Sequence, residues 1–316
     1  MKTVFLDYDT VSAGDLDSSA LRRAAGDLTL YDMDESQTLD RISGAEIVAL
    51  NGARLARESL LGAPDLKLVA LAATGTDNVD LNAARERGIA VCNVRAYCTA
   101  SVVQQVWGLI LSLTQHVDDY SRFVRSGSWT RDDLATVLKY PFRELEGRVF
   151  GVVGWGDLGR GAARVAEAFG MRVIVANRRG EPARPDRMEL TQLLAVADIL
   201  SLHCPLNDST RNLIGAHELS LMKPDALLIN TARGALVDGH ALGAALKAGR
   251  LGGAGIDVLA QEPPPHGEAL LDPAIPNLLL TPHIAWAARE ARQRCLDELA
   301  ANIQDFRGGG RRGRVV

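Results

Sequence analysis

The stretch VVGWGDLG, residues 152–159, decides the fold of the second half of this chain. It closes the apolar run GRVFGVVG (147–154), which is typical of a buried strand, and it precedes RGAARVAEAFG, which is typical of a helix. Glycines spaced G-x-G-x-x-G between a strand and a helix allow a tight turn, the close approach of a pyrophosphate and close helix packing. An unrelated strand-to-helix turn could also carry three glycines, but this context favours a dinucleotide-binding turn formed by Gly154, Gly156, Asp157, Leu158 and Gly159.

Strand-like runs lie on both sides of this turn. Downstream, five more runs bring the total to six, the number in a full dinucleotide-binding sheet: 171–177, 197–203, 226–232, 252–259 and 277–283. Upstream, shorter runs alternate with amphipathic segments: 3–8, 28–32, 45–50, 66–72 and 88–93. This alternation predicts an α/β protein, with a Rossmann-type doubly wound parallel sheet in the second half and a smaller flavodoxin-like α/β domain in the first. Between the two halves, residues 99–127 suit one long helix.

Composition narrows the class of protein. A length of 316 residues suggests two domains at the usual ~150 residues each. The net charge of -4 gives no reason to expect nucleic acid or a membrane as a partner, and the basic end RGGGRRGRVV (307–316) is interpreted as a frayed tail. No signal peptide is evident, and no apolar run approaches the ~18 residues of a membrane span. The cysteines have no C-x-x-C spacing, which predicts a cytoplasmic protein without disulfides or a metal site: Cys92, Cys98, Cys204 and Cys295.

The residue that ends the second strand of such a sheet usually holds the adenosine ribose, and a carboxylate there favours NAD. In this chain the position falls on Asn177 in VIVANRRG, and Arg178 and Arg179 follow at once. No acid is present to repel a 2′-phosphate, and two guanidinium groups can bind one, so NADP is the preferred cofactor. The alternative is that both arginines are solvated loop charges and that NAD binds.

Three residues whose side chains can transfer a proton or bind an anion follow three of the later strands. Arg233 comes after LLINTA, Glu262 lies in GIDVLAQEPP, and His283 ends LLLTPH. Parallel strands bring their carboxyl ends to one edge of a sheet, so these side chains can converge there. A carbonyl that accepts a hydride needs a proton donor, a cation for the adjacent carboxylate and a partner that keeps the donor charged. Each residue alone also has a structural explanation, as a turn arginine, a solvated loop acid or a capping histidine.

Several segments together resemble the D-isomer-specific 2-hydroxyacid dehydrogenase family across nearly the whole chain. They are GWGDLG, HCPLNDSTRNLIG, MKPDALLINTARGALVD, GGAGIDVLAQEPP and NLLLTPHIAWAAREARQR. AATGTDNVDLNAARERGIAVCNV and YCTASVVQQVWGLILSLTQ are most similar to glycerate dehydrogenases, also called hydroxypyruvate reductases. The resemblance implies an oxidoreductase with a cofactor domain at 98–286 and a discontinuous substrate domain at 1–97 and 287–316. We expect a homodimer through the cofactor domain, whose long helix could serve as a hinge or a dimer surface.

The resemblance also implies roles for individual residues. His283 would be the general acid and base, Glu262 would orient it and keep it charged, and Arg233 would bind the substrate carboxylate and carbonyl. Further substrate contacts would come from the backbone N–H groups of Thr74 and Gly75 and from a pocket wall at Trp286. Further cofactor contacts would come from His203, Cys204, Pro205, Thr210, Thr231, Ala232 and, to the nicotinamide amide, Asp257.

The same segments narrow the choice of substrate. Glu262 argues against formate dehydrogenase, because the oxidation of formate leaves no hydroxyl proton for a His–Glu pair to carry. No basic cluster beyond Arg233 is evident in the active-site segments, which argues against phosphoglycerate. Hydroxypyruvate and glyoxylate, reduced to D-glycerate and glycolate, are the predicted substrates. Two alternatives stay open: another 2-oxo acid reduced at the same site, such as phenylpyruvate, and a dinucleotide-sensing protein like the corepressors that resemble this family. The chain departs from the family at Asn177 and at Gln104-Gln105, where a Gln- or Glu-His pair is common.

Overall fold

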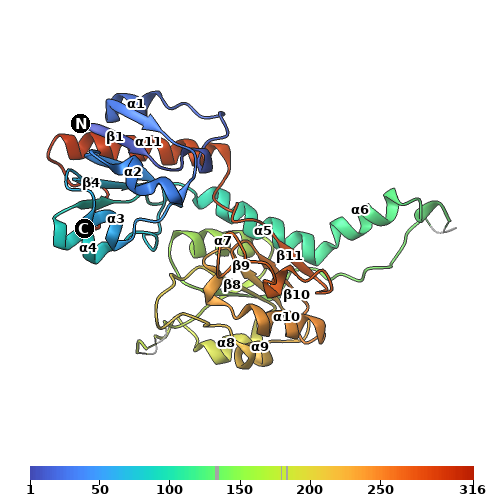
Figure 1. Ribbon diagram of the computed structural model, residues 1–316. Helices are drawn as coiled ribbons and strands as arrows, with labels where there is room; N and C mark the ends of the chain where they lie inside the picture. The colour runs from blue at the N-terminus through green and yellow to red at the C-terminus, as the bar shows by residue number, and fades with distance from the viewer. Residues whose placement is uncertain (132–134, 179, 183) are drawn as a thin grey trace. The chain divides into compact units, whose positions relative to one another are not determined.

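The computed structural model describes residues 1–131, 135–178, 180–182 and 184–316. The chain divides into two compact units, Met1–Cys98 with Trp286–Val316, and Thr99–Ala285 (Figure 1). Each unit contains one parallel sheet with helices, which confirms the predicted α/β class. The junctions between the units lie one residue from the domain bounds expected from the sequence.

The sheet of the first unit has the order β2-β1-β3-β4-β5, which is the flavodoxin-like order. Its strands are β1 (Lys2–Phe5), β2 (Asp27–Leu30), β3 (Ile47–Leu50), β4 (Leu68–Leu71) and β5 (Ala90–Cys92). Its helices are η1 (Tyr8–Thr10), α1 (Ser19–Ala25), η2 (Glu35–Gln37), α2 (Thr38–Ile42), α3 (Arg57–Leu61), α4 (Leu81–Arg87) and α11 (Arg289–Arg307). Neighbouring side chains of a strand point to opposite faces, and both faces are buried: Phe5 packs with α1 and α11, whereas Val4 packs with α2, α3 and α4. Burial on both faces explains why the inner strands β3 and β4 are continuous apolar runs.

The last helix, α11, belongs to the first unit although it follows the last strand of the second. At its start, Arg292 donates to both carboxylate oxygens of Asp15, at 2.8 and 2.7 Å. The helix completes the core beneath α1 with the buried residues Ala291, Cys295, Leu296, Leu299, Ala300 and Ile303.

The segment after α11 is ordered, so the prediction of a frayed tail is wrong. Val315 and Val316 exchange backbone hydrogen bonds with Val91 of β5, and Arg314 forms an antiparallel bridge with Cys92. Both valines also pack against the core of the first unit. Composition could not reveal this, because the tail is ordered by the free edge of a strand far earlier in the chain.

The sheet of the second unit has the order β11-β10-β9-β8-β6-β7. Its strands are β6 (Val149–Val153), β7 (Arg172–Val175), β8 (Ile199–Leu202), β9 (Leu227–Asn230), β10 (Gly253–Ile256) and β11 (Leu278–Leu280). Its helices are α5 (Thr99–Gln115), α6 (Val117–Arg125), η3 (Trp129–Arg131), α7 (Asp157–Ala168), α8 (Leu190–Val196), α9 (Ala216–Leu221), η4 (Gly234–Leu236), α10 (Gly239–Lys247) and η5 (Ala269–Leu271). A parallel bridge between Ala176 and Met188 extends the sheet beyond β7. The strand order reverses at β6, and doubly wound sheets bind ligands at the carboxyl ends of their strands beside such a reversal.

The helix predicted over residues 99–127 is interrupted, so that prediction is wrong in part. The structure has two helices, α5 and α6, separated by His116 with a φ of 50°. This left-handed conformation breaks a helix. The His116 ring stacks on Tyr140, and its Nδ1 lies 3.2 Å from Asp119 Oδ2. α5 packs on α7, β9 and β10, whereas α6 buries none of its residues.

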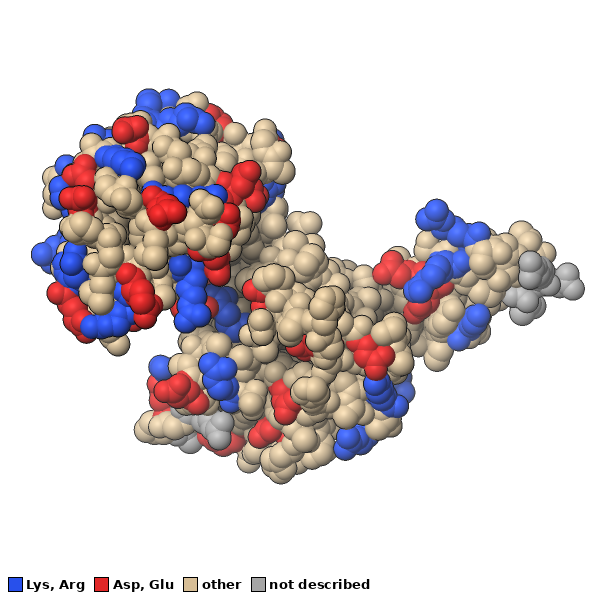
Figure 2. All heavy atoms as spheres, viewed as in Figure 1, with Lys and Arg blue, Asp and Glu red and all other residues tan. Residues whose placement is uncertain are grey.

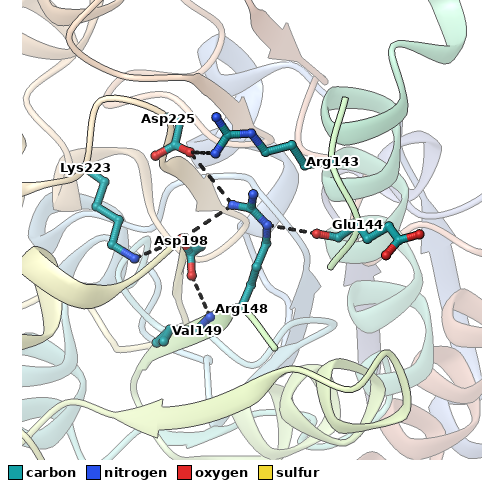
Figure 3. Close-up of polar contacts among 7 residues, drawn as sticks. All are labelled: Arg143, Glu144, Arg148, Val149, Asp198, Lys223 and Asp225. Carbon is teal, nitrogen blue, oxygen red and sulfur yellow. Dashed lines mark hydrogen bonds and ion pairs between the residues drawn. The ribbon is translucent and has the colours of Figure 1, made fainter. Parts of the chain in front are cut away.

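The amino-terminal edge of the second sheet carries a cluster of ion pairs, which we call the amino-edge network: Arg143, Arg148, Asp198, Lys223 and Asp225 (Figure 3). Asp198 precedes β8 and accepts hydrogen bonds from Lys223 Nζ at 2.9 Å, Val149 N at 2.7 Å and Arg148 Nη1 at 3.5 Å. Burial alone would raise the pKa of Asp198, but the Val149 N–H and the two cations hold it below its usual value. The network is therefore satisfied by the protein itself.

Charged side chains of both signs are interspersed on the face of the molecule shown in Figure 2. None of the described helices is long and apolar enough to cross a membrane. Within the described part of the chain, no group of three or more His, Cys, Asp or Glu residues is placed to hold a metal ion.

Candidate active site

The glycine-rich turn lies between β6 and α7, at the reversal in strand order. Gly154 has a φ of 101°, and a Cβ on it would lie 2.5 Å from the carbonyl carbon of His203. A Cβ on Gly159 would lie 2.1 Å from the carbonyl oxygen of Gly154. These two glycines are needed for packing, whereas a Cβ on Gly156 would meet no atom of the described residues within 4 Å. Gly156 is the N-cap of α7, so open space and the positive potential of a helix N-terminus coincide, which suits a pyrophosphate.

Asp157 and Leu158 form the start of α7. Asp157 Oδ1 accepts a hydrogen bond from Arg160 Nη2 at 2.8 Å. This pairing partly offsets the negative charge that Asp157 brings close to an anion site.

Buried side-chain atoms that lack a hydrogen-bond partner gather at the carboxyl ends of strands. Among the described residues there are four such atoms: Asn93 Oδ1, Asn177 Oδ1, His203 Nδ1 and Thr231 Oγ1. The last three follow β7, β8 and β9, on the edge of the second sheet that carries the glycine-rich turn. An unpaired buried polar atom costs about 1–3 kcal/mol, so this edge has the character of a ligand site whose partners arrive with the ligand.

Asn177 follows β7, where the sequence predicts the adenosine ribose. Its Nδ2 donates to Glu189 Oε1 at 2.9 Å and to the Glu181 carbonyl at 3.2 Å, so the unpaired Oδ1 can accept from a ribose hydroxyl. Arg178 pairs with Glu181 Oε1 at 2.9 Å, but its side chain is 75% exposed, and such a pair is weak enough to exchange for a phosphate. Arg179 lies outside the described residues.

The segment after β8 carries four of the predicted cofactor contacts. The His203 ring has Nε2 2.9 Å from Ser201 Oγ, and burial lowers its pKa to about 4, so the ring is neutral near neutral pH. Burial raises the pKa of the Cys204 thiol to about 11, which makes it unreactive. Thr210 Oγ1 donates to the Pro205 carbonyl at 2.8 Å and so fixes the turn between them.

β9 delivers the turn Thr231-Ala232-Arg233-Gly234 to the same edge. Asn230 Nδ2 donates to the Arg233 carbonyl at 2.9 Å, and its Oδ1 accepts from Ala232 N at 3.1 Å, so this buried amide sets the shape of the turn. A Cβ on Gly234 would lie 2.0 Å from the carbonyl carbon of Leu259. Arg233 is therefore followed by glycine because the loop after β10 passes directly against the chain at that point.

His283 and Glu262 form a close pair. His283 Nδ1 lies 2.6 Å from Glu262 Oε2, and Leu259 N donates to Glu262 Oε1 at 2.8 Å. Burial alone would raise the pKa of Glu262, but the hydrogen bond and charge of His283, the Leu259 N–H and the charge of Arg233 together hold it below its usual value. The ionised carboxylate therefore accepts from Nδ1–H, which leaves Nε2 to exchange a proton with a substrate. Arg233 and His283 thus both lie within electrostatic reach of Glu262, at the edge where the strand topology predicts them.

The turn that carries His283 is built around the buried carboxylate of Asp257. This carboxylate accepts hydrogen bonds from the Thr281 hydroxyl, from Ile284 N at 3.0 Å and from Ala285 N at 2.8 Å. His283 has a φ of 54°, and its N–H donates to the Asp257 carbonyl at 2.7 Å. Burial raises the pKa of Asp257 despite these hydrogen bonds. The family resemblance implies a contact of Asp257 with the nicotinamide amide, and the structure shows that its carboxylate shapes the turn of His283.

Two residues of α5 also hold this turn, and neither was predicted as a site residue. Gln105 Nε2 donates to Thr281 Oγ1 at 3.2 Å, and Ser101 Oγ donates to the Ala285 carbonyl at 2.6 Å. The sequence did contain one signal, the pair Gln104-Gln105 in an otherwise apolar helix, because a partly buried amide needs a hydrogen-bond partner.

The remaining predicted substrate residues belong to the first unit. Thr74 follows β4; its Oγ1 donates to the Val94 carbonyl at 2.7 Å, and its own carbonyl accepts from Asn93 Nδ2 at 2.6 Å. Gly75 follows Thr74 at the carboxyl edge of the same sheet. Trp286 packs edge to face on Tyr97, with 6.3 Å between the ring centroids.

A glycine-rich turn at the reversal of a doubly wound sheet, and an acid–base pair with a cation at the same edge, define a dinucleotide-dependent oxidoreductase. The sequence profile of the family "D-isomer specific 2-hydroxyacid dehydrogenase, NAD binding domain" matches residues 107–285. The glycerate dehydrogenase of Methylorubrum extorquens is 43% identical over 273 residues, which cover 86% of each chain. The hydroxypyruvate reductase of Blautia hydrogenotrophica is 34% identical over 317 residues, which cover 98% of each chain. This chain belongs to the D-isomer-specific 2-hydroxyacid dehydrogenase family.

Solved structures of the same architecture cover the full length of the chain. A Thermus thermophilus protein matches all of both chains with a TM-score of 0.87 and 34% identity. An acyclic imino acid reductase in complex with NADPH and D-Arg matches all of both chains with a TM-score of 0.85 and 29% identity. The D-lactate dehydrogenase of Aquifex aeolicus with NAD and lactic acid has a TM-score of 0.85 and 28% identity, over 98% of this chain and 96% of that one. The protein is an NAD(P)-linked D-2-hydroxyacid dehydrogenase, which uses a nicotinamide dinucleotide in the reduction of small 2-oxo acids.

Proposed function

We propose that this enzyme reduces hydroxypyruvate or glyoxylate with NADPH, giving D-glycerate or glycolate. The proposal rests on the pair formed by His283 Nδ1 and Glu262 Oε2, which lie 2.6 Å apart. The positive charge of Arg233 also stabilises the ionised form of this carboxylate. A 2-oxo acid needs a proton for its carbonyl oxygen and a cation for its carboxylate, and this trio can supply both. The related proteins from Methylorubrum extorquens, Blautia hydrogenotrophica and Thermococcus litoralis are named glycerate dehydrogenase, hydroxypyruvate reductase and glyoxylate reductase.

Each catalytic residue has one task in this proposal. Arg233 binds the substrate carboxylate and polarises the carbonyl, and His283 donates its Nε2 proton to the carbonyl oxygen. Glu262 accepts from Nδ1–H, which orients the ring and leaves Nε2 to exchange the proton. Further substrate contacts come from the backbone N–H groups of Thr74 and Gly75 and from the indole of Trp286.

The bound dinucleotide supplies the hydride. Gly156 offers the open backbone at the start of α7 for its pyrophosphate, and Asn177 offers an unpaired Oδ1 for its ribose. Asp257 meets the nicotinamide amide. The other proposed contacts are Gly154, Asp157, Leu158, Gly159, His203, Cys204, Pro205, Thr210, Thr231 and Ala232.

We favour NADP over NAD because of the residues at the expected ribose position. The residue at the ribose position is Asn177, which lacks the charge that would repel a 2′-phosphate, and Arg178 and Arg179 follow it. The exposed pairing of Arg178 with Glu181 is the competing interaction that a phosphate has to displace.

A panel of 2-oxo acids assayed with NADPH and NADH tests the proposal. The highest kcat/KM is expected for hydroxypyruvate or glyoxylate with NADPH. His283→Asn should abolish turnover of every acid in the panel, whereas His240→Asn, at an exposed position of the same unit, should leave it unchanged. A clear preference for phenylpyruvate would show that the substrate is a bulkier 2-oxo acid, reduced at the same site by Arg233, Glu262 and His283. Absence of turnover with every acid would favour a dinucleotide-sensing role like that of a corepressor.

We also propose that the protein is a cytoplasmic homodimer that associates through the cofactor unit. Segment 117–142 of that unit exposes large apolar side chains that a second copy could cover: Val117, Val124, Trp129, Leu138 and Phe142. The four cysteines are free thiols, as suits a reducing compartment. Sedimentation should give twice the chain mass of 33.9 kDa, and Leu138→Asp should shift the protein towards the monomer.

A further inference from the structure

Asn93 connects the C-terminal tail to the loop that carries Thr74 and Gly75. It follows β5 directly and is 5% exposed. Its Nδ2 donates to the Thr74 carbonyl at 2.6 Å, and its backbone N–H donates to the Gly313 carbonyl at 3.0 Å. Asn93 therefore forms hydrogen bonds with both the C-terminal tail and the loop after β4.

The loop after β4 is held by this neighbouring segment. Thr74 Oγ1 donates to the Val94 carbonyl at 2.7 Å, and Val94 N donates to the Ala73 carbonyl at 3.0 Å. With the bond from Asn93, three hydrogen bonds tie residues 73–74 to residues 93–94. The backbone N–H groups of Thr74 and Gly75 donate to no other described residue, so they are available to a ligand.

The tail contacts Asn93 so closely that one position has to be glycine. Gly313 has a φ of 63°, and a Cβ on it would lie 2.7 Å from the Asn93 carbonyl oxygen. Asn302 of α11 is 3% exposed, and its Nδ2 donates to that same oxygen at 3.0 Å. Beyond Gly313, Val315 and Val316 pair with Val91 on the edge of β5.

We propose that Asn93 and the tail, residues 313–316, form a positioning element for the substrate. They hold the N–H groups of Thr74 and Gly75 in the arrangement that receives the carboxylate of the 2-oxo acid. Asn93 is a positioning residue, since it acts through Thr74. The proposal rests on the proposed function of Thr74 and Gly75. It requires that a disturbed tail weakens substrate binding and spares the dinucleotide, whose site lies in the other unit.

Two glycines that follow α11 provide a matched test. Gly313 and Gly309 both have left-handed φ, 63° and 83°, so alanine strains the backbone at either position. A Cβ at 313 would clash with Asn93, whereas a Cβ at 309 would meet no atom of the described part of the chain within 4 Å. We expect Gly313→Ala to raise KM for hydroxypyruvate about tenfold with a smaller change in kcat, and Gly309→Ala to leave both near wild type. Fluorescence titration should give the same Kd for NADPH in both variants.

Asn93→Asp is a second variant, which keeps the side-chain shape but removes the Nδ2 donor to Thr74. It should also raise KM, with thermal unfolding used to verify that the protein is folded. The proposal is overturned if folded Gly313→Ala and Asn93→Asp proteins keep the KM of Gly309→Ala, or if KM and the Kd for NADPH rise together.

Hydrogen exchange over residues 72–76 gives a readout that does not depend on turnover. Exchange should be faster in Gly313→Ala than in Gly309→Ala, and equal rates would overturn the coupling of tail and loop. A wild-type enzyme that reduces none of the 2-oxo acids, with this difference in exchange intact, would contradict the proposed function and leave the coupling standing.

Discussion

The two edges of the sheet in the second unit use polar residues in opposite ways. At the amino edge, Asp198 is surrounded by Lys223, Arg148 and a backbone N–H (Figure 3). At the carboxyl edge, three side chains that follow strand ends each have one buried polar atom without a partner among the described residues: Asn177, His203 and Thr231. The first edge is satisfied by the protein alone, whereas the second leaves buried polar atoms without a partner, as is typical of a ligand site. In this protein the unpaired atoms, rather than the buried charges, distinguish the binding edge.

The strongest test of this contrast is Arg233→Ala. We expect kcat/KM for the preferred 2-oxo acid to fall about 10³-fold or more, because one change removes both the carboxylate's cation and the carbonyl's polariser. The thermal midpoint should change little, since Arg233 lies away from the amino-edge network. Arg233→Lys is the control that keeps the charge but loses the planar pair of donors. Near-normal kcat/KM in Arg233→Ala would contradict its role.

Glu262→Gln tests the proton donor at the same edge. The pKa of Glu262 is lowered, so it stays a carboxylate across the neutral range and accepts the Nδ1–H of His283. Without this carboxylate the ring loses its ionised acceptor, and the rate of reduction should fall about 10²-fold at neutral pH. Because the pKa of Glu262 lies below its ordinary value of 4.5, the wild-type enzyme should keep its advantage over the variant as pH falls from about 8 to about 5. A variant that matches the wild-type rate anywhere in this range would count against the assignment.

Asp198→Asn is the matching change at the amino edge. It leaves Lys223 and Arg148 without their shared carboxylate, and we expect the free energy of unfolding at neutral pH to fall by about 2 kcal/mol with kcat/KM unchanged. Because the pKa of Asp198 is lowered on folding, its contribution is present above the ordinary value of 3.8 and is lost as pH falls below it. Urea unfolding of both proteins at neutral and strongly acidic pH should show the difference closing. Asp225→Asn, at a more exposed site, should cost less. Loss of activity in Asp198→Asn would break the distinction between the edges.

The smallest expected effect concerns cofactor choice at Asn177. Asn177→Asp should shift the ratio of kcat/KM for NADPH and NADH towards NADH about tenfold by repelling the 2′-phosphate. The new carboxylate would also face Glu189 Oε1, which accepts from Asn177 Nδ2 at 2.9 Å. The double variant with Glu189→Gln restores a donor there, and Glu189→Gln alone is the control. An unchanged ratio in the double variant would show that the charge at this position does not select the nucleotide.

Local pattern and parallel topology were sufficient to predict the sheets and the site edge. Apolar runs predicted the strands of both sheets, and Arg233 and His283 were predicted at one edge because parallel strands share it. The break at His116 was not predicted, since the apolar pattern continues on both sides and a single left-handed residue makes the break.

Contacts between distant segments could not be predicted either. Gly234 has to be glycine because of Leu259, and Asp257 shapes the turn of His283 through hydrogen bonds to residues 281–285. Both facts appear only when loops from different strands meet. The order of the C-terminal tail was not predicted for the same reason. Its glycines are typical of a flexible segment, and only the folded structure shows that it pairs with the edge of β5.

The buried ring of His203, at the carboxyl edge of the second sheet, makes the stability of the fold sensitive to acid. Burial lowers its pKa from 6.5 to about 4. Between these pH values the His203 ring is therefore protonated in the unfolded chain and neutral in the folded protein. Unfolding therefore adds a proton to His203 in this range, and this residue lowers the stability of the fold at a higher pH than that at which the ion pairs of Asp198 are lost. A ligand that binds only the folded protein shifts this balance back by mass action. Saturation with the dinucleotide should thus extend the acid tolerance of the enzyme during handling and storage.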